Sequence, residues 1–446
     1  MLNVLLVGNG AREHAIAEAI MRSARSPRLF SYMKANNPGI ASLSESVVIG
    51  GYGDLSSIRD FAVSSQAHFA VIGPEDPLNY GVVDYLADAG IPSVGPAKDQ
   101  TRLETSKSFT RQLLAKYSIP GNPAFRSFTD LAGIEEFLDE IEEIVIKPDG
   151  LTGGKGVMVQ GDHFLTKKEA LSFCRDILRE HPSVTIEERL DGEEFSLQCF
   201  CDGRTVVATP PVQDHKRRFP DDRGPNTGGM GSYSCEDHLL PFLEPVDVAD
   251  GLDITRRVAE AIYRETGAPY KGIMYGGFMA TKSGVKLLEY NARFGDPEAM
   301  NVLPLLQTDF VDICEAIIEG ALEHCPVAFA GKATVCKYVV PKGYGLPKDH
   351  PEAGSTSAEI EVGDVGEAKL YFASVDKRGD GLYMTTSRAI GVLGMADRLS
   401  EAEKIAEGAV LAVIGPVDHR PDIGTAQLID KRVRHMRALR NRAYKI

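Results

Sequence analysis

The stretch that decides the fold is Val145–Val157, which reads VIKPDGLTGGKGV. Its apolar start predicts a buried strand that carries Lys147, and four glycines within the next seven residues predict a flexible turn before a strand resumes. The backbone amides of such a turn can curl around phosphate oxygens, and Lys147 and Lys155 supply positive charge on either side. The spacing is not that of a Walker loop, and a β-hairpin with a glycine turn and no ligand remains the alternative.

Carboxylates follow farther along the chain in Thr185–Glu194, which reads TIEERLDGEE. Acidic side chains just after a strand can accept hydrogen bonds from an adenine amino group and from ribose hydroxyls. This stretch is therefore a candidate for the nucleoside end of a nucleotide site, with a solvated acidic turn as the alternative.

A third informative stretch, Leu287–Glu298, reads LLEYNARFGDPE. On a strand, Glu289 and Asn291 are two residues apart and project from the same face. A carboxylate and an amide oxygen side by side are hard ligands that suit a Mg²⁺ ion bridged to phosphates. Arg293 lies one further step along that face, where a guanidinium can hold an anion with two hydrogen bonds. A half-exposed edge strand without a metal is the alternative.

The first hundred residues alternate short apolar runs with helical patterns. Strands are expected at Val4–Val7, Leu29–Met33, Val47–Ile49, Phe69–Ile72 and Pro92–Val94, and helices at Glu13–Ala24, Leu55–Ser64 and Val82–Ala89. This alternation predicts a parallel sheet with helices on both faces, and such sheets bind ligands beyond the carboxyl ends of their strands.

Gly8–His14 (GNGAREH) stands at the first of these strand ends. Glu13 occupies the position of the third glycine in a dinucleotide fingerprint, which weakens a nicotinamide interpretation. The turn instead predicts an anion site at a helix N-terminus, and a tight turn without a ligand is the alternative.

The rest of the chain changes from mixed to β-rich character. The expected elements are a helix at Thr105–Tyr117, an α+β stretch to about Leu190, a loop at Pro210–Gly231, a helix at Asp253–Thr266, strands at Gly272–Ala280 and Val285–Tyr290, and a helix at Phe310–Leu322. After Pro326, strands at Thr334–Val340, Ala368–Phe372 and Ala389–Leu393 precede a helix at Glu401–Val413. The fold class predicted is α/β.

Composition limits the classes of protein that need to be considered. The 446 residues suffice for about three domains, and the 43% hydrophobic fraction suits packed cores. The net charge of -14 argues against a nucleic-acid or membrane binder, and no apolar run approaches the ~18 residues of a membrane helix. The chain start does not resemble a signal peptide, and seven scattered cysteines without a C-x-x-C pair predict a cytoplasmic location.

Two basic clusters stand out against this acidic background. One comprises Lys216, Arg217, Arg218 and Arg223, and the other occupies Lys431–Lys445. The terminal cluster predicts a helix whose basic face is solvated.

Taken together, the motifs resemble those of ATP-grasp enzymes, and most closely those of the phosphoribosylamine–glycine ligase family. The similarity runs from Gly8 almost to the C-terminus and rests on Gly8–His14, Val71–Leu78, Thr105–Phe109, Ile146–Val157, Gln213–Arg217, Gly224–Gly231 and Glu289–Glu298. The stretches Pro225–Gly231 and Asn291–Glu298 are specific to this family. The resemblance implies an N-terminal substrate-binding α/β domain (1–103), a two-lobed α+β ATP-grasp domain (104–326, small lobe about 120–190) and a β-rich C-terminal domain (327–446).

The resemblance also implies roles for single residues. The residues expected to contact ATP are Lys107, Lys147, Leu151, Gly153, Gly154, Lys155, Gly156, Glu187, Leu190 and Glu194. Lys107 and Lys147 are expected to contact the phosphates, and Leu151–Gly156 to close over them. Glu187 and Leu190 are expected at adenine, and Glu194 at ribose. Glu289 and Asn291 are expected to hold Mg²⁺ or Mn²⁺. The expected substrate-binding residues are Gly10, Asn37, Gly39, Asp214, Lys216 and Arg293, of which the last three are the catalytic candidates.

The reaction implied is ATP-dependent ligation of glycine to 5-phosphoribosylamine in purine nucleotide biosynthesis. It yields N1-(5-phosphoribosyl)glycinamide, ADP and phosphate through a glycyl phosphate. The expected partners are these small molecules, without nucleic acid or membrane, and the expected state is a monomer or weak homodimer. The alternatives are another ATP-grasp carboxylate–amine ligase or carboxylase, and a nucleotide-responsive nucleic-acid binder that uses the basic C-terminus.

Two positions depart from the family pattern. Gly276–Phe278 stands where many ATP-grasp enzymes carry a further acidic metal ligand, which leaves the number of metal ions open. Thr386-Ser387-Arg388 stands where the family usually has Gly-Gly-Arg, a change that should alter a turn without removing function.

Overall fold

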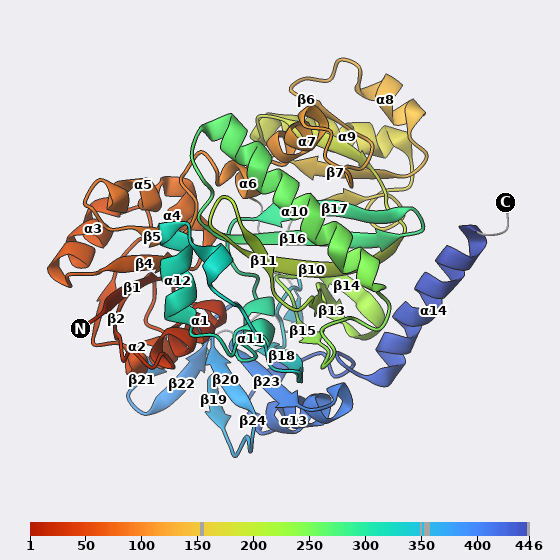
Figure 1. Ribbon diagram of the computed structural model, residues 1–446. Helices are drawn as coiled ribbons and strands as arrows, with labels where there is room; N and C mark the ends of the chain where they lie inside the picture. Colours follow the sequence, from red (N-terminus) through yellow and green to blue (C-terminus); the bar gives the residue numbers. More distant parts are fainter. Residues whose placement is uncertain (152–155, 348–349, 352–356, 444–446) are drawn as a thin grey trace.

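A computed structural model describes residues 1–151, 156–347, 350–351 and 357–443 (Figure 1). The N-terminal part is a five-stranded parallel sheet with the strand order β3-β2-β1-β4-β5. Its strands are β1 (Asn3–Val7), β2 (Arg28–Met33), β3 (Ser46–Ile49), β4 (Phe69–Ile72) and β5 (Ser93–Val94), and its helices are α1 (Ala11–Met21), α2 (Pro38–Leu43), α3 (Leu55–Ser64), α4 (Glu75–Tyr80) and α5 (Val82–Ala87). The predicted parallel sheet is confirmed.

Strand β1 shows why helices cover both faces of this sheet. Val4 and Leu6 pack in one hydrophobic cluster, whereas Leu5 and Val7 pack in another, and all four side chains are fully buried. Since successive side chains of a strand point to opposite faces, each face of the sheet has its own core. The carboxyl ends of β1 and β4 therefore open onto the edge where the polar turns lie.

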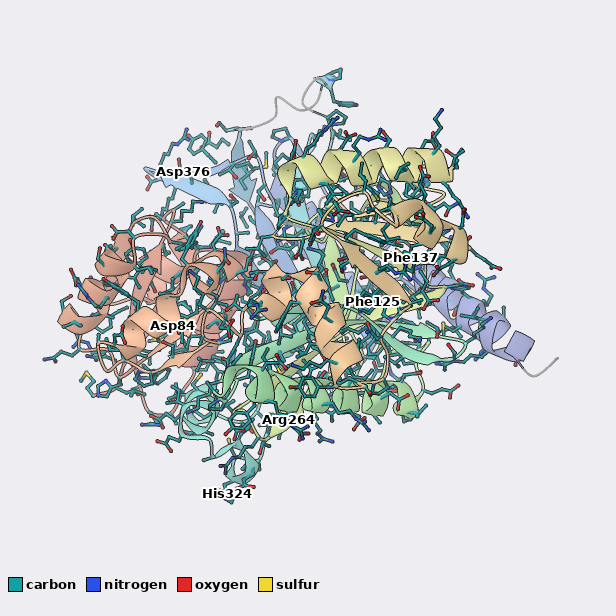
Figure 2. All side chains as sticks on the ribbon, turned by 90° about the horizontal axis from the view of Figure 1, so that it is seen from above. Asp84, Phe125, Phe137, Arg264, His324 and Asp376 are labelled. Carbon is teal, nitrogen blue, oxygen red and sulfur yellow. The ribbon has the colours of Figure 1, made fainter. Side chains whose placement is uncertain are left out.

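A small lobe follows after α6 (Arg102–Thr105) and α7 (Lys107–Lys116). It is an antiparallel sheet in the order β6-β9-β7-β8, packed against two helices. The elements are β6 (Phe125–Phe128), α8 (Ile134–Glu140), β7 (Ile144–Pro148), β8 (Met158–Val159), α9 (Lys167–Glu180) and β9 (Val184–Glu188). Figure 2, seen from above, marks this lobe by Phe125 and Phe137, apart from the N-terminal part, where Asp84 of α5 is labelled.

The large lobe is a second antiparallel sheet, ordered β11-β10-β16-β17. The long helix α10 (Pro245–Thr266) packs against it, with Arg264 marking its C-terminal end in Figure 2. The other elements are β10 (Gly192–Cys201), β11 (Val206–Ala208), β16 (Gly272–Thr281), β17 (Gly284–Asn291), α11 (Glu298–Val302) and α12 (Phe310–Glu319). The strands expected at Gly272–Ala280 and Val285–Tyr290 are confirmed as β16 and β17.

The segment Pro210–Gly231 differs from the loop that its composition predicts. It contains β12 (Gln213–Asp214), and the hairpin β13 (Arg217–Phe219) and β14 (Arg223–Asn226), before β15 (Gly231–Ser234). Proline and glycine are frequent in loops, but here β12 pairs with β15, and β15 pairs in turn with the C-terminal strand β18 (Ala333–Pro341), which lies far away in the sequence.

The C-terminal part is β-rich, as predicted. Its sheet has the order β12-β15-β18-β23-β20, so two strands from the middle of the chain complete it. The remaining elements are β19 (Glu359–Val362), β20 (Lys369–Phe372), β21 (Val375–Arg378), β22 (Gly381–Met384), β23 (Ile390–Ala396), α13 (Leu399–Leu411), β24 (Val413–Ile414), β25 (Val417–Asp418) and α14 (Ala426–Ala443).

The prediction that the basic C-terminal helix is solvated is wrong for its inner face. Helix α14 packs on β10 and β16, and Met436 and Leu439 are buried there. Arg440 pairs with Asp247 of α10 at 2.6 Å, and Asp247 is 2% exposed. Charge composition alone does not reveal these buried acidic partners on the neighbouring elements. No helix in the described ranges is both long and apolar enough to cross a membrane.

Two glycines near the α13–β23 contact predict opposite effects of the same substitution. A Cβ added to Gly394 of β23 would lie 2.0 Å from the carbonyl oxygen of Ala402 in α13, so Gly394→Ala should lower the free energy of unfolding by about 1–3 kcal/mol. Gly408 of α13 is exposed with nothing within 4 Å of an added Cβ, so Gly408→Ala should raise that free energy by up to ~1 kcal/mol. Urea denaturation of both variants checks this, and equal shifts of the same sign would contradict the packing described here.

Candidate active site

One face of the large-lobe sheet gathers the polar side chains that the β17 motif carries. Gly277 of β16 lies opposite Glu289 of β17, and Met279 of β16 lies opposite Glu194 of β10. Residues opposite one another on a sheet share a face, so Glu194, Glu289 and Asn291 project to the same side. The predicted shared face of Glu289 and Asn291 is thus a property of the sheet.

Lys216 joins this face from the turn between β12 and β13. Its Nζ atom lies 3.6 Å from Glu194 Oε2 and 3.9 Å from Glu289 Oε1. Burial on its own raises the pKa of Glu289, but the charges of Lys216, Lys147 and Lys107 outweigh it and lower that pKa. The pKa of Lys216 is raised because the nearby carboxylates outweigh its burial. Both groups are therefore charged at neutral pH.

A buried ion cluster joins the small lobe to this sheet. Arg111 of α7 donates from Nε to Glu187 Oε1 at 2.7 Å, and Lys147 Nζ lies 2.8 Å from Glu187 Oε2. Arg111 also donates to the carbonyl oxygens of Leu287 and Leu288 in β17. Burial raises the pKa of Glu187, but the two cations outweigh it and lower that pKa to about 2. The predicted contact of Glu187 with adenine stays a prediction, and its carboxylate is already paired within the protein.

Asp149 organises the base of the glycine-rich stretch. Its carboxylate accepts hydrogen bonds from Ser106 and Ser108, while Lys107 Nζ donates to the carbonyl oxygen of Gly150 at 2.9 Å. Lys107 and Lys147 both lie close enough to Glu289 for their charges to lower its pKa. Leu151 is exposed and Gly156 is half-buried, whereas Gly153, Gly154 and Lys155 lie outside the described residues. Leu190 is half-buried between β9 and β10.

Arg293 is a further cationic side chain near Glu289. Its Nη2 lies 2.8 Å from Glu104 Oε1, its Nε lies 3.2 Å from Glu75 Oε2, and its Nη2 also donates to Asn291 Oδ1 at 3.2 Å. Arg12 approaches the same Glu75 carboxylate at 3.9 Å. The two arginines outweigh burial and lower the pKa of Glu75 to about 2. Arg293 is thus held beside the proposed metal ligand Asn291 by carboxylates from two other elements.

Asp214 lies beside residues from the C-terminal part. A Cβ added to Gly229 would lie 2.8 Å from Asp214 Oδ1. Arg388 donates to the Gly229 carbonyl oxygen at 3.2 Å and pairs with Asp296 at 3.1 Å. Burial raises the pKa of Asp214, and the negative charge of Glu298 adds to this effect. An acidic group with a raised pKa next to cations is a candidate for proton handling.

The N-terminal candidates have different surroundings. Gly10 lies near Asp296, since a Cβ added to Gly10 would lie 3.7 Å from Asp296 Oδ2. Asn37 is 1% exposed, caps α2 by accepting from Gly39 N, and donates to the carbonyl oxygens of Asn9 and Phe372. These contacts give Asn37 a structural role, and its contact with substrate stays a prediction, as does that of Gly39.

The residues present fit a divalent cation that arrives with a nucleotide. Glu289 and Asn291 offer two hard oxygen donors on one strand face, which suits Mg²⁺ when phosphate oxygens complete the shell. Within the described parts of the chain, no group of three or more His, Cys, Asp or Glu side chains is arranged to hold a metal. Gly277 stands opposite Glu289, where a further acidic ligand would project onto the same face.

Several residues that contact one another around the candidate site are not predicted from the sequence. They are Arg12, Glu75, Glu104, Arg111, Glu298 and Arg388. Arg12 and Glu75 lie inside the recognised turns after β1 and β4, so their motifs contain a usable signal. Arg388 stands in the Thr386-Ser387-Arg388 departure from the family pattern, but only folding brings it to Gly229 and Asp296.

Comparisons with known proteins agree over nearly the whole chain. Residues 2–104 match the family "Phosphoribosylglycinamide synthetase, N domain", and residues 105–299 match "Phosphoribosylglycinamide synthetase, ATP-grasp (A) domain". A phosphoribosylamine–glycine ligase of Methanosarcina barkeri is 46% identical over 439 residues, which cover 98% of this chain and 100% of that relative.

Solved structures with the same fold extend this agreement. The phosphoribosylamine–glycine ligase of Thermotoga maritima superposes with a TM-score of 0.79 at 26% identity, covering 95% of this chain and 100% of that one. The biotin carboxylase domain of 2-oxoglutarate carboxylase from Hydrogenobacter thermophilus, in complex with MgADP, ADP and bicarbonate, superposes with a TM-score of 0.69 at 13% identity, covering 100% and 95%. The second likeness concerns the fold alone.

The ion cluster around Glu187 predicts a pH-dependent loss of stability. Glu187→Gln should destabilise the protein by about 3–5 kcal/mol at neutral pH, because Arg111 and Lys147 stay buried without a counter-charge. A carboxyl group with a lowered pKa contributes stability above its unfolded-state pKa and loses it on protonation. The difference between wild type and variant should therefore shrink as the pH falls from 4.5 to about 2.

Urea denaturation at stepped pH measures this difference. Glu135→Gln, an exposed position on α8 of the same lobe, is the matched control and should leave the midpoint at neutral pH nearly unchanged. A wild-type-to-variant difference that stays constant across that pH interval would contradict an ionic origin.

Proposed function

The chain belongs to the phosphoribosylglycinamide synthetase family, and on this premise we propose that it ligates glycine to 5-phosphoribosylamine in an ATP-dependent reaction. The products are N1-(5-phosphoribosyl)glycinamide, ADP and phosphate, a step of purine nucleotide biosynthesis. The observation that carries the proposal is the convergence of Lys216, Glu194 and Glu289 on one sheet face inside the region that matches the family.

ATP is proposed to bind between the two lobes. Lys107 and Lys147 meet the phosphates, Leu151–Gly156 covers them, and Glu187, Leu190 and Glu194 lie at the nucleoside end. The closeness of Lys147 to β17 supports this arrangement, since its Nζ donates to the Leu288 carbonyl oxygen at 3.2 Å. Lys147 therefore contacts the strand that carries Glu289, and Lys107 is near enough for its charge to lower the pKa of Glu289.

Glu289 and Asn291 are proposed to hold Mg²⁺ or Mn²⁺ together with the nucleotide. When bound, the cation neutralises phosphate charge and orients the γ-phosphoryl group. Arg293 restrains the Asn291 side chain through a hydrogen bond to its Oδ1 atom, so the donor amide is already oriented.

The chemistry needs activation of the glycine carboxylate. A carboxylate cannot expel oxide, so transfer of the γ-phosphoryl group to a carboxylate oxygen forms glycyl phosphate and ADP. The nitrogen of 5-phosphoribosylamine then attacks the carbonyl carbon and expels phosphate, with loss of a proton from that nitrogen. No side-chain nucleophile takes part in either step.

Lys216, Arg293 and Asp214 are proposed to act at the reacting groups. Lys216 and Arg293 stabilise negative charge on the transferring phosphoryl group and the carboxylate, because both are charged and fixed by carboxylates. Asp214, with its raised pKa, is the group proposed to accept the proton of the attacking amine. Gly10, Asn37 and Gly39 border the end proposed for 5-phosphoribosylamine.

The remaining aspects of the proposal concern location and partners. All seven cysteines are free thiols, which supports a reducing cytoplasm. The net charge of -14 favours small-molecule substrates over nucleic acid, and a monomer or weak homodimer is the proposed state.

An assay of phosphate release with each substrate omitted in turn tests the reaction. Release should require ATP, glycine and 5-phosphoribosylamine together, because glycyl phosphate is consumed only by the amine. Mg²⁺ and Mn²⁺ are compared in the same assay. Release that needs bicarbonate in place of glycine would instead indicate a carboxylase and refute the proposal.

Glu289→Gln tests the metal assignment. The substitution keeps size and hydrogen bonding but removes the negative charge that offsets the cation, so turnover should fall by about 10²-fold or more. Nucleotide affinity should fall less, because Lys107 and Lys147 remain. Glu260→Gln, which removes an exposed carboxylate of α10, is the control and should not change turnover. Normal turnover of Glu289→Gln at saturating ATP would end the metal assignment.

A further inference from the structure

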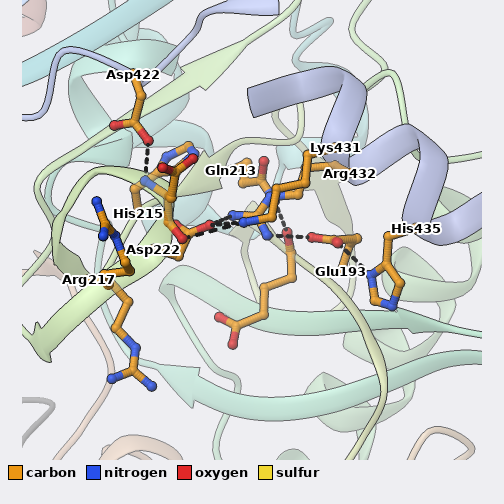
Figure 3. Close-up of polar contacts among 12 residues, drawn as sticks. Glu193, Gln213, His215, Arg217, Asp222, Asp422, Lys431, Arg432 and His435 are labelled. Carbon is orange, nitrogen blue, oxygen red and sulfur yellow. Dashed lines mark hydrogen bonds and ion pairs between the residues drawn. The ribbon is translucent and has the colours of Figure 1, made fainter. Parts of the chain in front are cut away.

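Arg432 of α14 lies between two acidic side chains that belong to different parts of the chain. Its Nη1 atom lies 3.2 Å from Glu193 Oε2 of β10, and its Nη2 atom donates to Asp222 Oδ2 at the tip of the β13–β14 hairpin. Figure 3 shows Arg432 reaching from the helix to both carboxylates, with His435 on the far side of Glu193. One guanidinium thus joins the start of β10 to the hairpin.

Glu193, the first of these partners, is the neighbour in sequence of Glu194, a residue of the candidate active site. Glu193 and Glu194 are consecutive in β10, so their side chains point to opposite faces of the sheet. Glu193 faces α14, where His435 Nδ1 lies 2.7 Å away, whereas Glu194 faces Lys216 in the cleft. Arg432 therefore contacts β10 on the face of the sheet opposite to the one from which Glu194 projects.

The second partner sits in an unusual backbone conformation. Asp221 and Asp222 have φ values of 61° and 59°, in the left-handed region that non-glycine residues uncommonly adopt. Such a turn persists only where its surroundings hold it. Arg432 and Arg420 both contact the Asp222 carboxylate, and Asp422 accepts a hydrogen bond from Asp221 N.

The hairpin transmits this restraint to Lys216. Its strands pair at Arg217 with Asn226, and Thr227 donates from both N and Oγ1 to the carbonyl oxygen of Lys216, at 2.7 and 2.9 Å. Arg420, clamped on Asp222, also donates to the Arg217 carbonyl oxygen at 3.1 Å. Tip and base of the hairpin are thus one hydrogen-bonded unit that ends at Lys216.

We propose that Arg432 is a positioning residue for the active site, acting through Asp222 on Lys216 and through Glu193 on Glu194. The inference rests on the proposed function and deepens it, because it assigns a role to the basic C-terminal helix that lies outside the residues matched by either family domain. Arg432 does not touch the reacting groups. It fixes the separation of two segments that both end at the same sheet face.

Arginine is required for this role by geometry. Its planar fork offers two separate N–H groups to two carboxylates at once, whereas the lysine ammonium is a point charge on a flexible stem. Arg432→Lys keeps the charge opposite Glu193 and Asp222 and so should leave the fold intact, but it should not hold both segments in register.

The experiment compares Arg432→Lys with Arg434→Lys, an exposed position two residues further along the same helix, whose Nε donates to the Asp430 carbonyl oxygen. Arg432→Lys should lower kcat/KM for glycine by about tenfold or more, since small misplacements of positioned groups have large effects on rate. The KM for ATP should change less than kcat, because Lys107 and Lys147 do not depend on Arg432. Arg434→Lys should behave as wild type.

A second readout follows the hairpin without substrates. Amide hydrogen exchange of residues 217–226 should be faster in Arg432→Lys, while exchange of β1 and β4 and the melting temperature should match those of Arg434→Lys. Unchanged exchange of 217–226, or a kcat/KM within about twofold of wild type, would overturn the inference. A wild-type protein that makes no product would refute the proposed function instead, and the exchange measurement would still decide the role of Arg432.

Discussion

The buried cluster of Arg111, Glu187 and Lys147 is the interaction on which the placement of the small lobe against β17 depends. It joins helix α7 to strands β7 and β9 of the small lobe. Arg111 also donates to the carbonyl oxygens of Leu287 and Leu288 in β17 of the large lobe. A buried charge without a partner is strongly destabilising, so each of the three side chains is committed to this geometry. The relation between Lys147 and the strand that carries Glu289 follows from it.

Positively charged side chains gather around Glu289, although the net charge of the chain is negative. The net charge of the sequence is -14, yet the charges of Lys107, Lys147, Lys216 and Arg293 all act on Glu289. Each cation is held by carboxylates or backbone carbonyl oxygens, which reduces the repulsion among the cations before an anionic nucleotide binds. The lowered pKa values of Glu75 and Glu187, both about 2, keep those carboxylates ionised at neutral pH.

The C-terminal part does more than complete a sheet. Strands β12 and β15, which flank the turn with Lys216 and the Gly224–Gly231 loop, pair into the same sheet as β18 and β23. Arg388 reaches Gly229 and Asp296 from this side, and α14 reaches Asp222. The segments proposed to bind substrate therefore contact residues that lie 92 to 210 positions away in the sequence.

Local patterns determine much of this protein from the sequence alone. Alternating apolar runs predict the parallel sheet, and the two-residue spacing of Glu289 and Asn291 predicts their shared face, because strand periodicity needs no knowledge of distant contacts. Tertiary structure alone decides the strands within Pro210–Gly231, the buried pairing of Glu187, and the acidic partners of the basic helix α14. Each of these depends on which distant segment lies alongside, and a linear pattern of charge, proline and glycine contains no record of that neighbour.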